Sequence, residues 1–237
     1  MKGGGLRRLS YLLPISLLVV LILTPSGCSD SDDNIPVDEP GYKVRFDEHG
    51  NIISSPDPSY NVSVDDTGNR IITVKEGIGH FSTVYPDGFV LSRIKIDKSG
   101  GIESLLVDFI GPVTADVGLP LINIAVVNYQ DHLTAERAME IRLSSARNYD
   151  SFKLLDESIL TVAGVTAYQT SYYFDTYPYD LHIPPPEDAV LVTWLDRIVI
   201  FDYGDYQWNI YLGSDPSREE HDMAVFDRIL DSFKILD

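Results

Sequence analysis

The sequence of 237 residues has little of what several common kinds of site require. It contains one cysteine, which excludes an internal disulfide and a zinc site built from several thiolates. Its 18 lysines and arginines are outnumbered by 36 acidic residues, and the formal net charge is −18. Nucleic acid is therefore not an expected partner, because neutralising phosphates requires clustered cations. The five histidines lie far apart, and none has the spacing of a metal-ligand pair.

Motifs for nucleophilic and phosphate chemistry are also missing. The chain has no Gly-x-Ser-x-Gly elbow, no Gly-x-x-x-x-Gly-Lys loop and no Gly-x-Gly-x-x-Gly loop. Paired carboxylates occur at 65–66, 187–188 and 219–220, but in so acidic a chain they are expected on solvated faces. No catalytic residue is predicted. An enzyme with residues scattered along the chain stays open, and a convergent histidine and carboxylate would favour it.

Residues 1–27 are typical of a secretory signal. Three cations, Lys2, Arg7 and Arg8, precede a short apolar run over 11–23, and small or turn-forming residues follow it. This run is shorter than the stretch of about 20 apolar residues that a bilayer span needs. An uncleaved membrane anchor is the alternative interpretation.

The tripeptide Ser26-Gly27-Cys28 follows this run and resembles the lipobox of bacterial lipoproteins, in which two small residues precede a lipidated cysteine. That family usually has leucine where this chain has Pro25. The resemblance implies that Cys28 is acylated and that a membrane is a partner through this lipid anchor. Loss of residues 1–27 would remove three positive charges from the net −18 and leave −21. The expected location is the outer face of the bacterial cytoplasmic membrane or a periplasmic membrane face.

Residues 28–41 are expected to form an acidic tether. After the cysteine, the segment 29–41 is polar, acidic and contains prolines, a composition that favours a solvated chain. Its negative charge repels anionic headgroups, so we expect it to hold the folded body away from the membrane surface.

Residues 42–70 are predicted to form a β-hairpin extension. Three segments of the chain share a strand, an Asp-x-x-Gly turn and a second apolar run. Their aspartate–glycine pairs are Asp47–Gly50, Asp65–Gly68 and Asp97–Gly100. The aspartate accepts hydrogen bonds from downstream backbone N–H groups, and the glycine supplies a positive φ. Calcium ligation by these turns is the alternative, although they lack the ordered oxygen ligands of an EF-hand loop.

Residues 71–237 are predicted to form one domain of strands and helices. A helix is expected over 134–148 with Thr134 as its N-cap, and a C-terminal helix is expected to begin with a cap at either Asp215 or Ser217. Strands are expected at 71–74, 81–85, 102–110, 121–127, 152–162, 165–174, 189–202 and 206–212.

Within this domain lie the strand end Tyr85-Pro86-Asp87-Gly88-Phe89, the hairpin over 164–168 and the closing helix over 226–234. In these segments the chain resembles the Mog1/PsbP superfamily, in particular the PsbP-like lipoproteins of bacteria. The resemblance implies an α+β fold, an α/β/α sandwich around a central antiparallel sheet, preceded here by the β-hairpins. It also implies an accessory or assembly factor that is not an enzyme. Photosynthetic members are linked to calcium and manganese, but no metal-ligand motif carries over to this chain.

Aromatic residues gather around the loop over 175–188, which contains three consecutive prolines. Tyrosine is enriched at interfaces because it combines a large ring with a polar tip, and long stiffened loops commonly serve recognition. The candidate interface for a protein partner comprises Tyr177, Tyr179, His182, Tyr203, Tyr206 and Trp208. The alternative is that half of these aromatic side chains point inward from strands.

Together these features predict a lipid-anchored, extracytoplasmic accessory, assembly or binding protein without catalysis. A calcium-responsive binding module is the first alternative, because calcium (Ca2+) favours the oxygen ligands that an acidic surface offers. An enzyme with a scattered active site is the second.

Overall fold

A computed structural model of the chain describes residues 60–75, 77–98, 102–112, 119–128, 133–149, 151–177 and 191–236, together with the backbone of 45–46 and 52–53. The chain divides into two units, residues 1–36 and 37–237, and all of these residues belong to the second. The signal, the acidic tether, Cys28, Tyr179 and His182 lie outside the described residues. No helix in the described part of the chain is long and apolar enough to cross a membrane.

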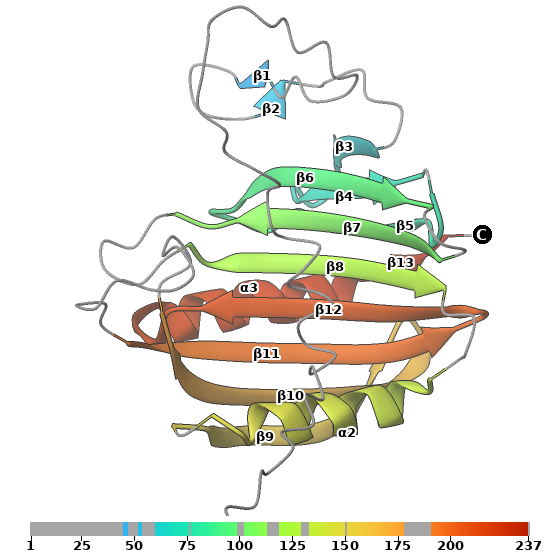
Figure 1. Cartoon of the computed structure of the whole chain (residues 1–237). Coiled ribbons are helices and arrows are strands. Elements are labelled where there is room, and N and C mark those ends of the chain that lie inside the picture. The colour runs from blue at the N-terminus through green and yellow to red at the C-terminus, as the bar shows by residue number, and fades with distance from the viewer. Residues whose placement is uncertain are drawn as a thin grey trace, which may run out of the picture. The chain divides into compact units, whose positions relative to one another are not determined.

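The centre of the fold is a seven-stranded sheet in which every neighbouring pair is antiparallel (Figure 1). Its strands in chain order are β6 (Val90–Asp97), β7 (Glu103–Ile110), β8 (Leu121–Asn128), β9 (Lys153–Val162), β10 (Val165–Thr176), β11 (Val192–Tyr203) and β12 (Tyr206–Ser214). Their spatial order is β6-β7-β8-β12-β11-β10-β9, so β9 and β6 are the two edges. All eight predicted strands match, within a few residues, strands of this sheet or of the smaller one.

A second, four-stranded sheet has the order β13-β5-β4-β3. Its strands are β3 (Tyr60–Val64), β4 (Arg70–Val74), β5 (Phe81–Val84) and β13 (Lys234–Ile235), and a separate two-stranded ribbon joins β1 (Arg45–Phe46) to β2 (Ile52–Ile53). The boundary expected at 70/71 falls within the β3–β4 hairpin, whose five pairs run from Tyr60–Val74 to Val64–Arg70. Residues 60–70 therefore belong with the folded body, because β3 completes a sheet that packs on the core.

The turn of this hairpin confirms the prediction for Asp65. Its Oδ1 accepts hydrogen bonds from the backbone N–H of Thr67 (2.9 Å) and of Asn69 (2.8 Å), and from the Thr67 hydroxyl (2.7 Å). Gly68 follows with a φ of +88°, a conformation that residues with a side chain rarely adopt. These hydrogen bonds lower the pKa of Asp65, and they occupy the carboxylate in holding the turn.

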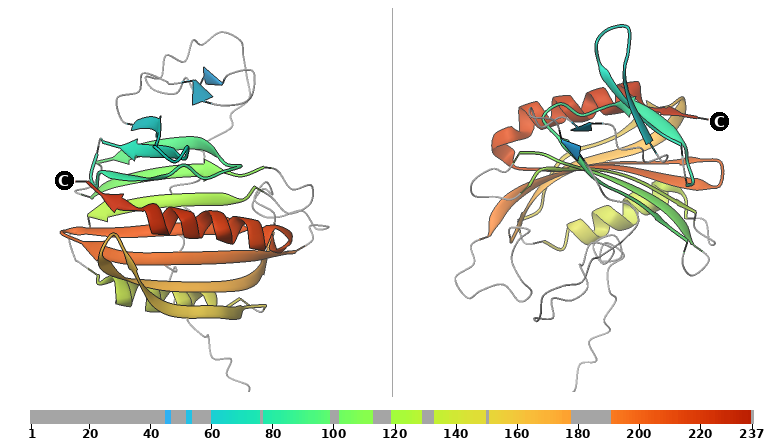
Figure 2. Two further views of the ribbon diagram at one scale, coloured as in Figure 1. Left: turned by 180° about the vertical axis from the view of Figure 1, so that it is seen from behind. Right: turned by 90° about the horizontal axis from the view of Figure 1, so that it is seen from above.

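One face of the large sheet is covered by the helix α3 (Glu219–Ser232) and the four-stranded sheet, as Figure 2 shows. A one-turn 3₁₀ helix, η1 (Pro216–Arg218), precedes α3, and the Asp215 side chain caps it by accepting from the Ser217 N–H at 2.8 Å. The structure thus selects the Asp215 cap over the Ser217 capping box. Apolar residues from β12 and α3 meet between these layers. They recur at every second residue in β12 and at three- and four-residue steps in α3.

The opposite face of the sheet is covered over β10 and β11 by α2 (Ala135–Ala146). Its predicted N-cap is confirmed, since the Thr134 side chain accepts from the Arg137 N–H at 3.3 Å. Asp202 at the end of β11 also accepts from the Ala135 N–H at 2.7 Å, which ties the helix start to the sheet. Helix, sheet and helix therefore form the expected α+β sandwich, with the small sheet added to one outer layer.

Candidate functional site

Within the described part of the chain, the predicted interface residues do not form one surface. Tyr177 directly follows Thr176, which pairs with the first residue of β11, Val192, whereas Tyr203 is the last residue of β11. At about 3.3 Å per residue, a strand of this length separates its two ends by roughly 35 Å. Tyr203 pairs with Tyr206 across the β11–β12 turn, so these two tyrosines do lie together. Tyr177 and Tyr203 are both exposed, at 42% and 38%, but they belong to opposite ends of the sheet.

The prediction that Trp208 belongs to an interface is wrong. Its side chain is fully buried, stacked on Phe201 with ring centroids 5.8 Å apart and edge-on to Phe81 at 6.0 Å. The physical reason is the two-residue period of β12, which sends Trp208, Ile210 and Leu212 together into the core beneath α3. The alternative, that aromatic residues of the strands alternate inward, is correct for this residue.

Exposed apolar side chains instead gather where β9 and β11 begin and β10 ends. Of the ten large hydrophobic residues that are exposed in the described part of the chain, five belong to this region. They are Tyr149, Leu154, Leu155, Tyr177 and Leu191, and we call this set the apolar end. The strand register places Leu154 opposite Tyr172 and the first residue of β11, Val192, opposite Thr176, so these residues lie toward one end of the sheet. Tyr149 joins them by stacking on Phe174, with centroids 4.9 Å apart.

The backbone at the apolar end is fixed by contacts between distant parts of the chain. The Ser151 hydroxyl accepts a hydrogen bond from the Asp175 N–H at 2.5 Å, which ties the turn after α2 to the end of β10. Phe152 packs against Tyr172 with centroids 5.2 Å apart, and Tyr172 in turn lies 5.9 Å from Phe174. These contacts fix the end of β10 and the turn after α2 relative to each other, and the ring stacking holds Tyr149 against Phe174.

Beneath the apolar end, a buried carboxylate joins three strands under α2. Asp196 on β11 accepts a hydrogen bond from the Tyr172 hydroxyl at 3.0 Å and from the Tyr211 hydroxyl at 2.6 Å. The Arg142 guanidinium of α2 lies over the Tyr211 ring, 5.6 Å from its centroid. Burial raises the pKa of Asp196, while Arg142 and the two phenols act in the opposite direction. Burial also raises the pKa of Tyr172, so this phenol stays a donor.

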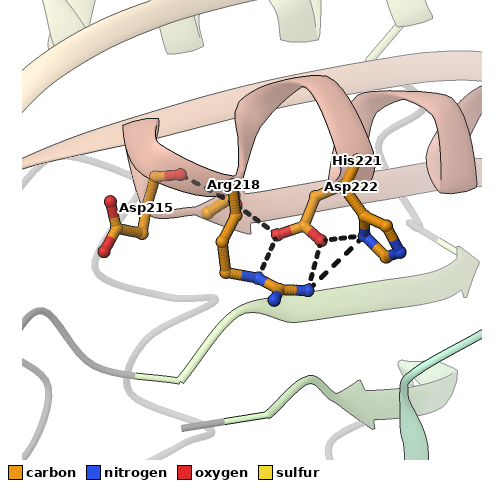
Figure 3. A network of polar contacts seen from close by, with 5 residues as sticks. Asp215, Arg218, His221 and Asp222 are labelled. Atoms are coloured by element: carbon orange, nitrogen blue, oxygen red, sulfur yellow. Dashed lines mark hydrogen bonds and ion pairs between the residues drawn. The ribbon is translucent and has the colours of Figure 1, made fainter. Parts of the chain in front are cut away.

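A second buried carboxylate, Asp222, holds the start of α3 (Figure 3). It accepts from the Ser214 hydroxyl at 2.5 Å and from Arg218 Nη2 at 2.8 Å, and His221 Nδ1 lies 2.9 Å from Asp222 Oδ1. Serine, histidine and aspartate thus meet here, but the serine hydroxyl donates to the aspartate and not to the histidine. A hydrolytic triad needs the histidine between the other two, so this arrangement does not activate Ser214. It anchors the helix instead.

Sequence reasoning missed both buried carboxylates. Asp196 does carry a signal, because it stands with Arg197 inside the otherwise apolar run of β11. Asp222 carries none, since an acidic residue in the first turn of a helix is ordinarily solvated. Among the described residues, no three histidine, cysteine or acidic side chains are grouped so that they could hold a metal ion.

Neither a family model nor a curated protein matches this chain. Solved structures do. LpqN, involved in cell envelope biogenesis of Mycobacterium tuberculosis, matches with a TM-score of 0.45 and 13% identity over 70% of this chain and 91% of its own. A cyanobacterial PsbP from Synechocystis matches with 0.40 and 15%, over 75% and 93%. The Ran-binding protein Mog1p of Saccharomyces cerevisiae matches with 0.42 and 11%, over 75% and 96%.

Proposed function

We propose that this chain is a lipoprotein held outside the cytoplasm by acylated Cys28, and that its folded body binds a protein partner without catalysis of its own. The observation that carries the binding role is the apolar end, where five of the ten exposed large hydrophobic side chains of the described residues lie toward one end of the sheet. Tyrosine and leucine gathered in this way are typical of the centre of a protein interface rather than of an ordinary solvated surface. Because the Ser151–Asp175 hydrogen bond already fixes the backbone there, little conformational entropy would be lost on binding.

The anchor rests on the sequence at Ser26-Gly27-Cys28 and the apolar run before it. Stable attachment of an acylated protein takes more than one chain, a condition that a diacyl- or triacyl-cysteine meets. The acidic segment after Cys28 would let the body stand away from anionic headgroups. In that position the apolar end is available to a partner.

The buried polar groups support a binding role over a catalytic one. Asp196 and Asp222 are each surrounded by donors of the folded body, namely phenols in one case and a hydroxyl with a guanidinium in the other. Carboxylates saturated in this way specify the packing of strands and a helix. A general base, in contrast, needs a lone pair that reaches a substrate.

The binding role is tested by crosslinking in intact cells, with mass spectrometry of what is captured. The double variant Tyr177→Ala with Leu191→Ser removes apolar surface at the apolar end and should reduce the captured partner at least several-fold. The matched control is Tyr203→Ala, because Tyr203 is similarly exposed but lies at the other end of β11. Equal capture by the wild type and the double variant, or equal loss in both variants, would refute this assignment.

The anchor is tested separately by metabolic labelling with an alkyne palmitate analogue. The wild type should take up the label and fractionate with membranes, whereas Cys28→Ala should remain unlabelled. A wild-type chain that stays unlabelled and inside spheroplasts would disprove anchoring without bearing on the apolar end.

A further inference from the structure

The strand β9 is an edge of the seven-stranded sheet, and within the described part of the chain no strand pairs with its outer side. From Glu157 to Val162 its pairing with β10 is regular. The register shift that marks a bulge lies before this stretch, at Leu155. Residues 157–162 therefore offer an undistorted edge on which another strand could continue the sheet.

The other long edge is protected in the ways that folded proteins use against such pairing. β6 has a register shift between Leu91 and Arg93, and its C-terminal part carries the charged residues Arg93, Lys95 and Asp97. Charges and bulges of this kind discourage a second strand from adding. In 157–162, by contrast, Glu157 is the one charged residue.

An apolar side chain is exposed in the middle of this edge. Ile159 is 68% exposed, although it pairs with Tyr168, which packs against the cluster under α2. Glu157 and Thr161 flank it on the same face, since side chains two apart along a strand share a face. Asp156, on the other face, is already engaged by Ser158 at 2.8 Å and Gln169 at 2.9 Å. A cross-strand partner would thus meet Ile159 with the exposed carboxylate of Glu157 beside it.

We infer that β9 binds a protein partner by strand addition, and that the added segment is extended, aliphatic opposite Ile159 and basic near Glu157. The inference rests on the proposed binding function and names the kind of partner. Opposite charges and apolar pairs across neighbouring strands stabilise a sheet, whereas like charges destabilise it. A second copy of this chain is therefore a poor occupant, because two strongly acidic chains repel each other. The edge is also continuous with the apolar end through Leu154 and Leu155.

The test uses the full-length lipoprotein in detergent and a fluorescent nine-residue peptide of threonines with valine at position 5 and lysine at positions 3 and 7. In an extended strand the valine and both lysines share one face, as Ile159 and Glu157 do. Fluorescence anisotropy should show binding, and hydrogen exchange should show protection of the amides of 157–162. Ile159→Lys should weaken binding about tenfold or more, because it removes apolar contact and adds a like charge. The matched control is Val64→Lys, since Val64 is also 68% exposed and lies on β3, an edge of the other sheet.

Two peptide controls separate strand addition from simple charge attraction. Replacing alternate threonines by proline removes backbone donors and should abolish binding, and replacing both lysines by glutamate should weaken binding strongly. Failure of the valine–lysine peptide to bind, equal binding by the proline peptide, or equal loss in Ile159→Lys and Val64→Lys would each overturn the inference. So would a dimer of the full-length chain that Ile159→Lys abolishes. None of these results depends on labelling of Cys28 or on capture through Tyr177, so the proposed function can stand without this inference.

Discussion

The Tyr211 hydroxyl of β12 donates a 2.6 Å hydrogen bond to Asp196 Oδ1 of β11, and so joins the two strands beneath α2. Burial raises the pKa of Asp196, so its native state binds a proton at a pH where the unfolded state has released it. The contribution of this carboxyl to the free energy of unfolding is therefore full below about pH 4 and falls as the pH rises through its native pKa.

The side chain of the variant Asp196→Asn cannot titrate, so the variant should lack this pH-dependent loss of stability. As the pH rises above about 4, the wild type should lose stability relative to the variant, as measured by urea unfolding at several pH values. If the wild type instead becomes more stable relative to the variant as the pH rises, the interaction with Arg142 outweighs burial and lowers the native pKa of Asp196.

Gly213 faces this same cluster and leaves room for it. A Cβ at this position would lie 2.5 Å from the Tyr211 hydroxyl oxygen and 2.8 Å from Trp194 Nε1. Gly213→Ala should therefore destabilise the protein by about 2 kcal/mol. Removing the hydroxyl as well, in Gly213→Ala with Tyr211→Phe, should cost less than the sum of the two single changes in thermal unfolding. If the two single changes add strictly, the contact between the new Cβ and the Tyr211 hydroxyl is not what destabilises Gly213→Ala.

Trp208 fills the core between the large sheet and α3. Trp208→Ala should destabilise the protein by about 4 kcal/mol, since it removes a fully buried ring. Tyr203→Ala, an exposed aromatic at the nearby turn, should change the free energy of unfolding by about 0.5 kcal/mol or less. Comparable losses in chemical denaturation of the two variants would contradict the inward orientation of Trp208.

Tyr173 on β10 donates a hydrogen bond to Glu219 at the start of α3, and this bond raises its pKa to about 12. Between its ordinary pKa of 10.0 and that value, the native phenol keeps a proton that the unfolded chain loses. Stability should thus fall with rising pH over this window, and Tyr173→Phe should lack that component.

The measurement is the ultraviolet titration of tyrosinate, with Tyr173 identified by the difference from Tyr173→Phe. In Glu219→Gln the pKa of Tyr173 should return toward 10.0, because the carboxylate that holds its proton is gone. An unchanged titration in that variant would place the cause of the raised pKa elsewhere.

Local patterns in the sequence were sufficient for most elements of the fold. Thr134 was identified as an N-cap and Asp65 as a turn residue because each acts on backbone groups only a few positions away. The strands followed from two-residue alternation and the helices from three- and four-residue steps. The short strand β13 left no such pattern, since its two residues pair with β5 from the far end of the chain.

The candidate site depended on contacts that no local pattern contains. By itself, the sequence determined that tyrosines are abundant near β10 and β11, that one cysteine follows an apolar run, and that the chain is strongly acidic. Only the tertiary structure decided that Trp208 points inward, that Tyr177 and Tyr203 lie at opposite ends of the sheet, and that Tyr149 stacks on Phe174 of β10. Periodicity states that alternate residues share a face, but which face meets the core depends on how sheets and helices stack, and that is set by residues far apart in the chain.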